Sequence, residues 1–88
     1  MDQEDFSLLT TEQLRAARGL LGWSQTKLAQ QAGLSLPTVK RLETGVGPRV
    51  SDEVRSTIQR TLEMAGVEFI QENGGGPGVR FRRRQKQK

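Results

Sequence analysis

Residues 24–45 read SQTKLAQQAGLSLPTVKRLETG and predict two short helices joined by a tight turn. Ser24 and Ser35 each stand directly before an apolar-periodic run. A serine hydroxyl at such a position accepts a hydrogen bond from a free backbone N–H of the first helical turn. We therefore expect helices over residues 25–32 and 36–44, and so short a connection obliges the two helices to cross closely.

The residues at the expected crossing fit a close contact between the two helices. Ala29 supplies a small side chain on the first helix, and Val39 and Leu42 supply apolar anchors on the second. Gly33 ends the first helix, where a residue of positive φ is needed and glycine adopts it at the least cost. Pro37 falls in the first turn of the second helix, where its missing N–H costs no hydrogen bond. Each position alone is weak evidence, but together with both caps they predict a closely crossed pair.

Further helices are expected on both sides of this pair. Thr10 is suited to cap a helix that Gln13 completes as its capping-box partner and that stops near Leu20. Ser51 is suited to cap a fourth helix, which Gly66 ends. The acidic residues that follow Ser51 favour the positive end of that helix dipole.

After the fourth helix the hydrophobic period changes to that of strands. Residues 67–70 and 79–82 alternate apolar and polar side chains, and the glycine-rich segment 71–78 separates them. We interpret this pattern as a β-hairpin, although the composition also fits a disordered glycine-rich linker with a basic end. In the hairpin, one face is expected to lie on the helices, with the side chains of Val67, Phe69, Val79 and Phe81.

Length and composition exclude several classes of protein. Eighty-eight residues allow one small domain, and dimerisation would help so small a core. The chain has no cysteine and no histidine, so disulfides, thiolate chemistry and the usual general base are excluded. It has no apolar run of the roughly 18 residues that a membrane span needs. We expect a soluble intracellular protein that is not an enzyme and needs no metal or cofactor.

The net charge of +4 is unevenly distributed along the chain. Residues 1–76 hold eight Lys or Arg and ten Asp or Glu, whereas residues 77–88 hold six Lys or Arg and no acid. A body near neutrality with a basic end favours a polyanionic partner reached by an arm. The alternative is a solvated tail that only aids solubility, and RNA binding by this tail is a further possibility.

Four segments of the chain resemble the Xre/Cro-type helix-turn-helix regulators. They read LLGWSQ at 20–25, LA at 28–29, AGLS at 32–35 and TVKRLETG at 38–45, and the resemblance runs without gaps across about residues 11–45. It implies sequence-specific binding of double-stranded DNA and transcriptional control, usually repression by dimers. It also implies a cytoplasmic bacterial protein that joins the nucleoid when bound.

Pattern and resemblance together predict a mainly α fold. We expect a compact four-helix helix-turn-helix domain of the lambda-repressor type over residues 1–66. A C-terminal β-hairpin over residues 67–82 should pack on it, and residues 83–88 should form a basic disordered tail. Many relatives carry a fifth helix or a dimerising element in place of this hairpin.

In this family the helix expected over 36–44 enters the major groove, with its N-terminal residues at base edges. Thr38 and Arg41 share one helix face, and Arg41 is suited to a bidentate contact with guanine. Leu36 and Pro37 stand where well-known relatives often have glutamines, which leaves apolar contacts, such as to thymine methyl groups, at these positions. The resemblance therefore predicts how the helix docks on DNA, but it does not predict which bases are read.

Other residues of the unit are better suited to the phosphate backbone. Lys40, Thr44 and Arg49 follow the base-reading positions, and Gln25 opens a helix whose free N–H groups suit an anion. In the family this glutamine also packs against the recognition helix. Glu43 is expected to form a local ion pair with neighbouring cations. The predicted interface comprises Gln25, Lys27, Ser35, Leu36, Pro37, Thr38, Lys40, Arg41, Thr44 and Arg49.

Double-stranded DNA is the expected partner, with a homodimer forming at least on DNA. No membrane and no small-molecule substrate are expected. Two alternatives share the same residues: the DNA-binding antitoxin of a toxin–antitoxin pair, and a protein-interaction adaptor built on the same scaffold. An adaptor would show acidic or apolar residues on the exposed recognition face, whereas residues 24–49 carry four bases against one acid.

Overall fold

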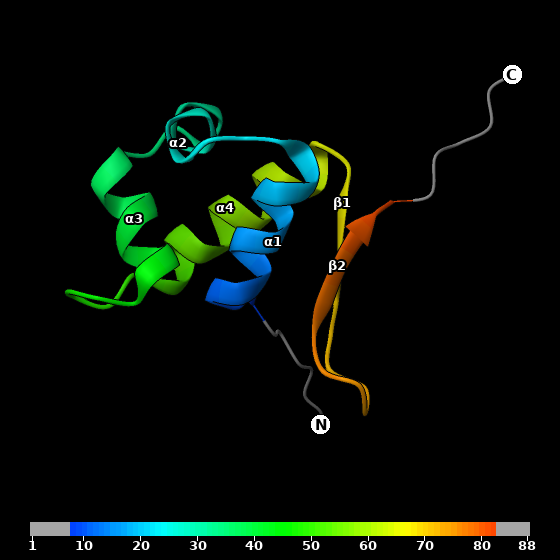
Figure 1. The fold of residues 1–88 in the computed structure, drawn as a ribbon. Helices are drawn as coiled ribbons and strands as arrows, with labels where there is room; N and C mark the ends of the chain where they lie inside the picture. The colour runs from blue at the N-terminus through cyan, green and yellow to red at the C-terminus, as the bar shows by residue number, and fades with distance from the viewer. Residues whose placement is uncertain (1–7, 83–88) are drawn as a thin grey trace, which may run out of the picture.

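The computed structural model describes residues 8–82 and contains four helices followed by a two-stranded antiparallel hairpin (Figure 1). The predicted fold class is confirmed. The basic tail expected over residues 83–88 lies outside the described residues. The elements are α1 (Thr11–Leu21), α2 (Gln25–Ala32), α3 (Leu36–Thr44), α4 (Asp52–Met64), β1 (Val67–Ile70) and β2 (Gly78–Phe81).

Each helix starts directly after the residue that the sequence predicted as its cap. The side chains of Thr10, Ser24, Ser35 and Ser51 all accept a hydrogen bond from the backbone N–H three residues further on. Thr10 and Gln13 also form the predicted capping box. The predicted bounds of α2 and α3 are correct, whereas α1 continues one residue beyond Leu20. The C-cap of α4 is Ala65 and not Gly66, and β2 runs one residue earlier than predicted, over Gly78–Phe81 instead of 79–82.

The hydrophobic core draws on all four helices and on the first strand. Leu14, Leu28, Leu42 and Ile58 come from α1, α2, α3 and α4 and are fully buried, as is Val67 of β1. The hairpin therefore takes part in the same core as the helices, and Figure 1 shows it along the flank of the bundle beside α1. A disordered linker over these residues is excluded.

The expectation that four hairpin side chains face the helices is correct for three of them. Val67 is buried, and Phe69 and Val79 pack against the core as partners in the strand register. Phe81, opposite Val67, is 54% exposed. Val67 at the same end of the sheet is fully buried, so the core covers β1 there and leaves the end of β2 exposed. Met64, the last residue of α4, is likewise 81% exposed.

A buried glutamine joins the hairpin to the start of α1. Gln13 is 6% exposed, and its Oε1 accepts a hydrogen bond from the N–H of Thr10 at 2.9 Å. Its Nε2 donates to the carbonyl oxygens of Ile70 at 3.2 Å and Gly78 at 2.9 Å, where the two strands leave the loop. One side chain thus caps a helix and holds the loop end of the sheet.

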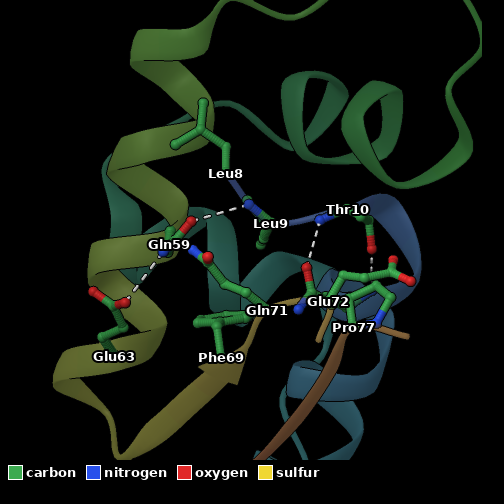
Figure 2. Close-up of a pocket in the computed structure, with 10 residues that line it drawn as sticks. Leu8, Leu9, Thr10, Gln59, Glu63, Phe69, Gln71, Glu72 and Pro77 are labelled. Atoms are coloured by element: carbon green, nitrogen blue, oxygen red, sulfur yellow. Dashed lines mark hydrogen bonds between the residues drawn. The ribbon is translucent and has the colours of Figure 1, made fainter. Parts of the chain in front are cut away.

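A pocket of about 380 Å³ lies between the start of α1, α4 and the hairpin (Figure 2). On its α4 side, Gln59 accepts a hydrogen bond from the N–H of Leu9 at 3.0 Å and donates to Glu63 at 3.2 Å. The pocket is lined by Leu8, Leu9, Thr10, Gln13, Gln59, Glu63, Phe69, Gln71, Glu72 and Pro77. No residue of the predicted interface is among them.

Candidate nucleic-acid interface

The turn between α2 and α3 has the conformation that its glycine predicts. Gly33 has φ of 71°, and the N–H of Leu34 donates to the carbonyl oxygen of Ala29 at 2.9 Å. Ala29 is 5% exposed, and Val39 and Leu42 of α3 are buried. The small residue and the two anchors therefore belong to the core, and the remaining faces of α2 and α3 are left for a partner.

Every residue of the predicted interface keeps some solvent exposure. Lys27, Ser35, Pro37, Lys40, Thr44 and Arg49 are exposed, and Gln25, Leu36, Thr38 and Arg41 are half-buried. All but Arg49 lie on α2, α3 or the turn between them, and Arg49 lies in the loop before α4.

Three predicted hydroxyl groups already take part in hydrogen bonds within the unit. The Oγ atoms of Ser35 and Thr38 lie 2.8 Å apart, and Ser35 also accepts from the N–H of Thr38. Thr44 donates to the carbonyl oxygen of Lys40 at 2.9 Å and accepts from the N–H of Val46 at 3.1 Å. A hydroxyl offers one donor and two acceptor positions, so Thr38 keeps capacity for a further partner.

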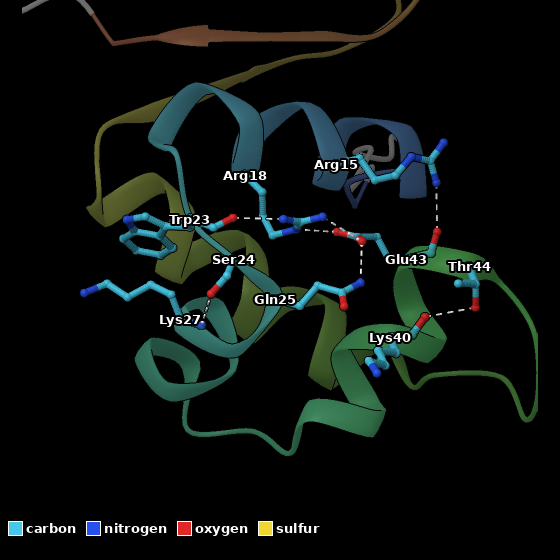
Figure 3. A network of polar contacts seen from close by, with 9 residues as sticks. All are labelled: Arg15, Arg18, Trp23, Ser24, Gln25, Lys27, Lys40, Glu43 and Thr44. Atoms are coloured by element: carbon cyan, nitrogen blue, oxygen red, sulfur yellow. Dashed lines mark hydrogen bonds and ion pairs between the residues drawn. The ribbon is translucent and has the colours of Figure 1, made fainter.

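The sole acid of residues 24–49 does not pair with its neighbours on α3. Glu43 is 4% exposed and accepts two hydrogen bonds from Arg18 of α1, at 2.6 and 2.9 Å (Figure 3). Gln25 donates to the same carboxylate at 2.7 Å, and Arg15 donates to the backbone carbonyl of Glu43 at 2.8 Å. The expectation of a local pair is therefore wrong: this carboxylate points into the junction of α1, α2 and α3, away from the exposed cations of α3.

The electrostatics of this junction keep Glu43 ionised. Burial by itself raises the pKa of the carboxyl group, because the charged form loses hydration. Hydrogen bonds from Arg18 and Gln25 and the charges of Arg18 and Arg15 outweigh that effect, so the pKa of Glu43 lies below its ordinary value. The amide of Gln25 is oriented by this carboxylate, which agrees with the expected packing of that glutamine against α3.

Lys27 and Arg41 have environments that the sequence did not indicate. The Nζ of Lys27 lies 5.9 Å from the centre of the Trp23 ring, at cation–π distance. The stem of Arg41 lies under the loop of residues 45–50, since a Cβ placed on Gly47 would be 3.1 Å from its Cδ. Arg41 thus lies beside the loop that carries Arg49, and both line a pocket of about 210 Å³.

Sequence reasoning missed two residues that organise the unit. Arg18 neutralises Glu43 and also donates to the carbonyl oxygen of Trp23 at 2.8 Å. Arg55 of α4 lines the pocket beside Arg41. Both are arginines on helices outside the α2–α3 pair, and only the helix crossings bring them close. A lone acid in an otherwise basic unit was the one signal that a distant cation was needed.

The comparisons with known proteins agree with this geometry. A family model described as a helix-turn-helix domain matches residues 11–68, which is more than half of the chain. No curated protein matches the chain. Among the described residues no helix has both the length and the apolar character to cross a membrane. A helix-turn-helix domain implies DNA binding, and the match is consistent with the resemblance to Xre/Cro-type regulators. The chain belongs to the family of helix-turn-helix domains.

Proposed function

We propose that this protein is a sequence-specific transcriptional repressor that binds double-stranded DNA with α3 in the major groove. It acts as a homodimer on its operator, in the bacterial cytoplasm and on the nucleoid. Repression needs only that the protein occupies the operator.

The observation that supports this proposal best is the charge of the exposed helix-turn-helix surface. Residues 24–49 hold Lys27, Lys40, Arg41 and Arg49 against one acid, Glu43. That acid is 4% exposed and is neutralised by Arg18. The surface of the unit thus presents cations without an exposed carboxylate, which suits a polyanion and is unfavourable for a basic protein partner.

In the proposed complex the two ends of α3 have different tasks. At its start, the exposed Pro37 and the half-buried Leu36 and Thr38 face base edges, where apolar groups contact thymine methyls and the threonine hydroxyl meets a donor or acceptor. Lys40 and the start of α2 face phosphates. Gln25 opens α2, and its amide is already held by Glu43. Such a pre-oriented contact loses little entropy on binding.

The experiment is an in vitro selection of bound duplexes from a random pool, performed with the full chain. We expect a defined motif to be enriched, and Lys40→Glu, which reverses one exposed charge on α3, to lower retention of every duplex. Glu72→Lys, an exposed change on the hairpin loop, is the control that reverses charge elsewhere. A pool that binds but stays random contradicts sequence-specific recognition. A chain that retains no duplex even at low salt favours the adaptor alternative.

A further inference from the structure

We propose that Arg41, Arg49 and Arg55 form a pocket for a single phosphate group under the loop of residues 45–50. In the complex this group is a phosphodiester of the DNA backbone, and this identification rests on the proposed function. The affinity of the pocket for a phosphate group does not depend on that function. Arg55 is a new member of the interface, and Arg41 receives a phosphate in place of a guanine.

The pocket is a hollow of about 210 Å³ with three arginines among its lining residues. The other lining residues are Leu42, Gly45, Gly47, Pro48 and Val50, so no carboxylate of the described residues lines it. Three like charges around one hollow repel one another and produce a positive potential there. An oxyanion in the hollow relieves that repulsion, and a phosphate offers several acceptor oxygens to the three side chains.

Arg41 carries a buried donor without an acceptor. Its Nε is buried, and no hydrogen-bond partner exists for it within residues 8–82. A guanidinium cannot lose its proton to relieve this, and a buried donor without a partner is costly. Arg41 lines the pocket, so an anion held there brings an acceptor close to this side chain.

The other two arginines are available to the same anion. Arg49 lies 3.3 Å from Asp52, but both side chains are more than 70% exposed, so this pair is weak and easily exchanged. Arg55 donates one hydrogen bond from Nη1 to the carbonyl oxygen of Leu9 at 3.0 Å. A guanidinium has five donors, so that bond fixes Arg55 in place and leaves other N–H groups free.

The loop itself directs Arg41 towards this task. Gly47 has φ of 99°, and a Cβ there would be 3.1 Å from the Cδ of Arg41, so the loop backbone lies directly on the arginine stem. This contact holds the side chain at the C-terminal half of α3, beside the loop, whereas base edges are met by the N-terminal residues of such a helix. The geometry therefore favours a backbone phosphate for Arg41.

The first arm of the test uses inorganic phosphate and NMR of the full chain with ¹⁵N-labelled arginine, at constant ionic strength kept with sodium chloride. The Nε–H signal of Arg41 is assigned by its loss in Arg41→Lys. We expect that signal to shift saturably with phosphate. Arg60, exposed on α4 and outside the pocket lining, is the matched control and should not respond.

The second arm measures duplex binding against salt for the wild type, Arg41→Gln and Arg60→Gln. If Arg41 meets one phosphate, its loss should make the slope of log K against log salt shallower by about 0.9. Affinity for the selected site and for random duplex should fall by the same factor. Arg41→Lys keeps the charge and the stem, so it separates loss of the contact from loss of folding. Arg60→Gln should change neither quantity.

The outcomes separate the pocket from the proposed function. A saturable Arg41 shift with phosphate in a chain that binds no duplex supports the pocket and refutes the DNA-binding proposal. Duplex binding with an Arg41 signal that responds neither to phosphate nor to duplex overturns the pocket. A shift that chloride reproduces equally overturns it too, as does a changed base preference in Arg41→Gln.

Discussion

The guanidinium of Arg18 on α1 donates two hydrogen bonds to the carboxylate of Glu43 on α3, from Nε to Oε2 at 2.6 Å and from Nη2 to Oε1 at 2.9 Å. The two residues are 25 positions apart. Because Gln25 donates to the same carboxylate, this pair joins the first three helices at one point. The ion pair therefore adds a polar contact to the apolar packing of Val39 and Leu42 that holds α3 in place.

We predict that the stability of the protein falls in acid through Glu43. The folded-state pKa lies below the ordinary value of 4.5, so the unfolded chain takes up the proton first as the pH falls. The stabilisation is complete well above pH 4.5 and is lost as the pH falls through the lower folded-state pKa. Urea unfolding of the wild type and Glu43→Gln across this range measures it.

The size of the Glu43→Gln effect at neutral pH follows from burial. Removing one partner of a buried ion pair costs about 3–5 kcal/mol, and we expect the lower end because the Arg18 side chain is 21% exposed. Glu72→Gln, at an exposed hairpin-loop position, is the control and should leave stability and its pH profile unchanged. Equal profiles for the wild type and Glu43→Gln would contradict the assignment.

Gln13→Ala should loosen the hairpin. The carbonyl oxygens of Ile70 and Gly78 lose their shared donor, and an unsatisfied buried polar group costs about 1–3 kcal/mol. Hydrogen exchange should accelerate at the amides of β2 more than at those of α2. Gln30→Ala, at an exposed position on α2, is the matched control. The same exchange pattern in both variants would contradict the proposal that Gln13 holds the hairpin.

Substitution of Gly33 should disturb folding and DNA binding together. Its φ is 71°, and a Cβ there meets no atom within 4 Å, so the cost lies in the backbone conformation alone. A left-handed conformation costs an L-residue about 1–2 kcal/mol, and Gly33→Val, with its branched side chain, should lose at least that. Gly33→Asn should lose less, because asparagine tolerates this region better.

Gly19, which lies within α1, is the control glycine for Gly33. Gly19 has no positive φ and equally open surroundings, so Gly19→Ala should stabilise the helix by about 0.5–1 kcal/mol. The melting temperature should fall in Gly33→Val and rise in Gly19→Ala. An unchanged melting temperature in Gly33→Val would contradict the role of Gly33 in the turn between α2 and α3.

The operator should be an inverted repeat. Dimers of this kind place their half-sites about one helical turn apart, so we expect a spacing of about 10 bp. Sequencing of the selected pool and sedimentation of the complex measure the symmetry and the stoichiometry. Asymmetric sites bound one-to-one would contradict the dimer.

The basic end of the chain should strengthen binding without choosing bases. Deletion of residues 83–88 removes four positive charges. If most of them meet phosphates, the salt slope should become shallower by roughly two to four units. The ranking of DNA sequences should stay the same, because phosphate contacts carry no base information. An unchanged slope would leave the segment a role in solubility only.

Local chemistry made most of the fold predictable. The hydroxyl groups of Ser24, Ser35 and Ser51 cap helices by accepting hydrogen bonds from the N–H three residues further on. Gly33 adopts the positive φ that the end of α2 requires. Such interactions need no knowledge of the rest of the molecule. The predicted interface follows from positions on α2, α3, their turn and the next loop together with the resemblance to helix-turn-helix regulators, and its role in DNA binding stays a prediction.

The sequence by itself determined where the helices begin, the turn between α2 and α3, and the alternating pattern of the two strands, because these depend on neighbours along the chain. Tertiary structure alone decided that Glu43 pairs with Arg18, that Gln13 reaches Ile70 and Gly78, and that Phe81 stays exposed. It also placed Arg55 beside Arg41. These placements depend on how the helices and the hairpin pack, and that packing arises from the whole core.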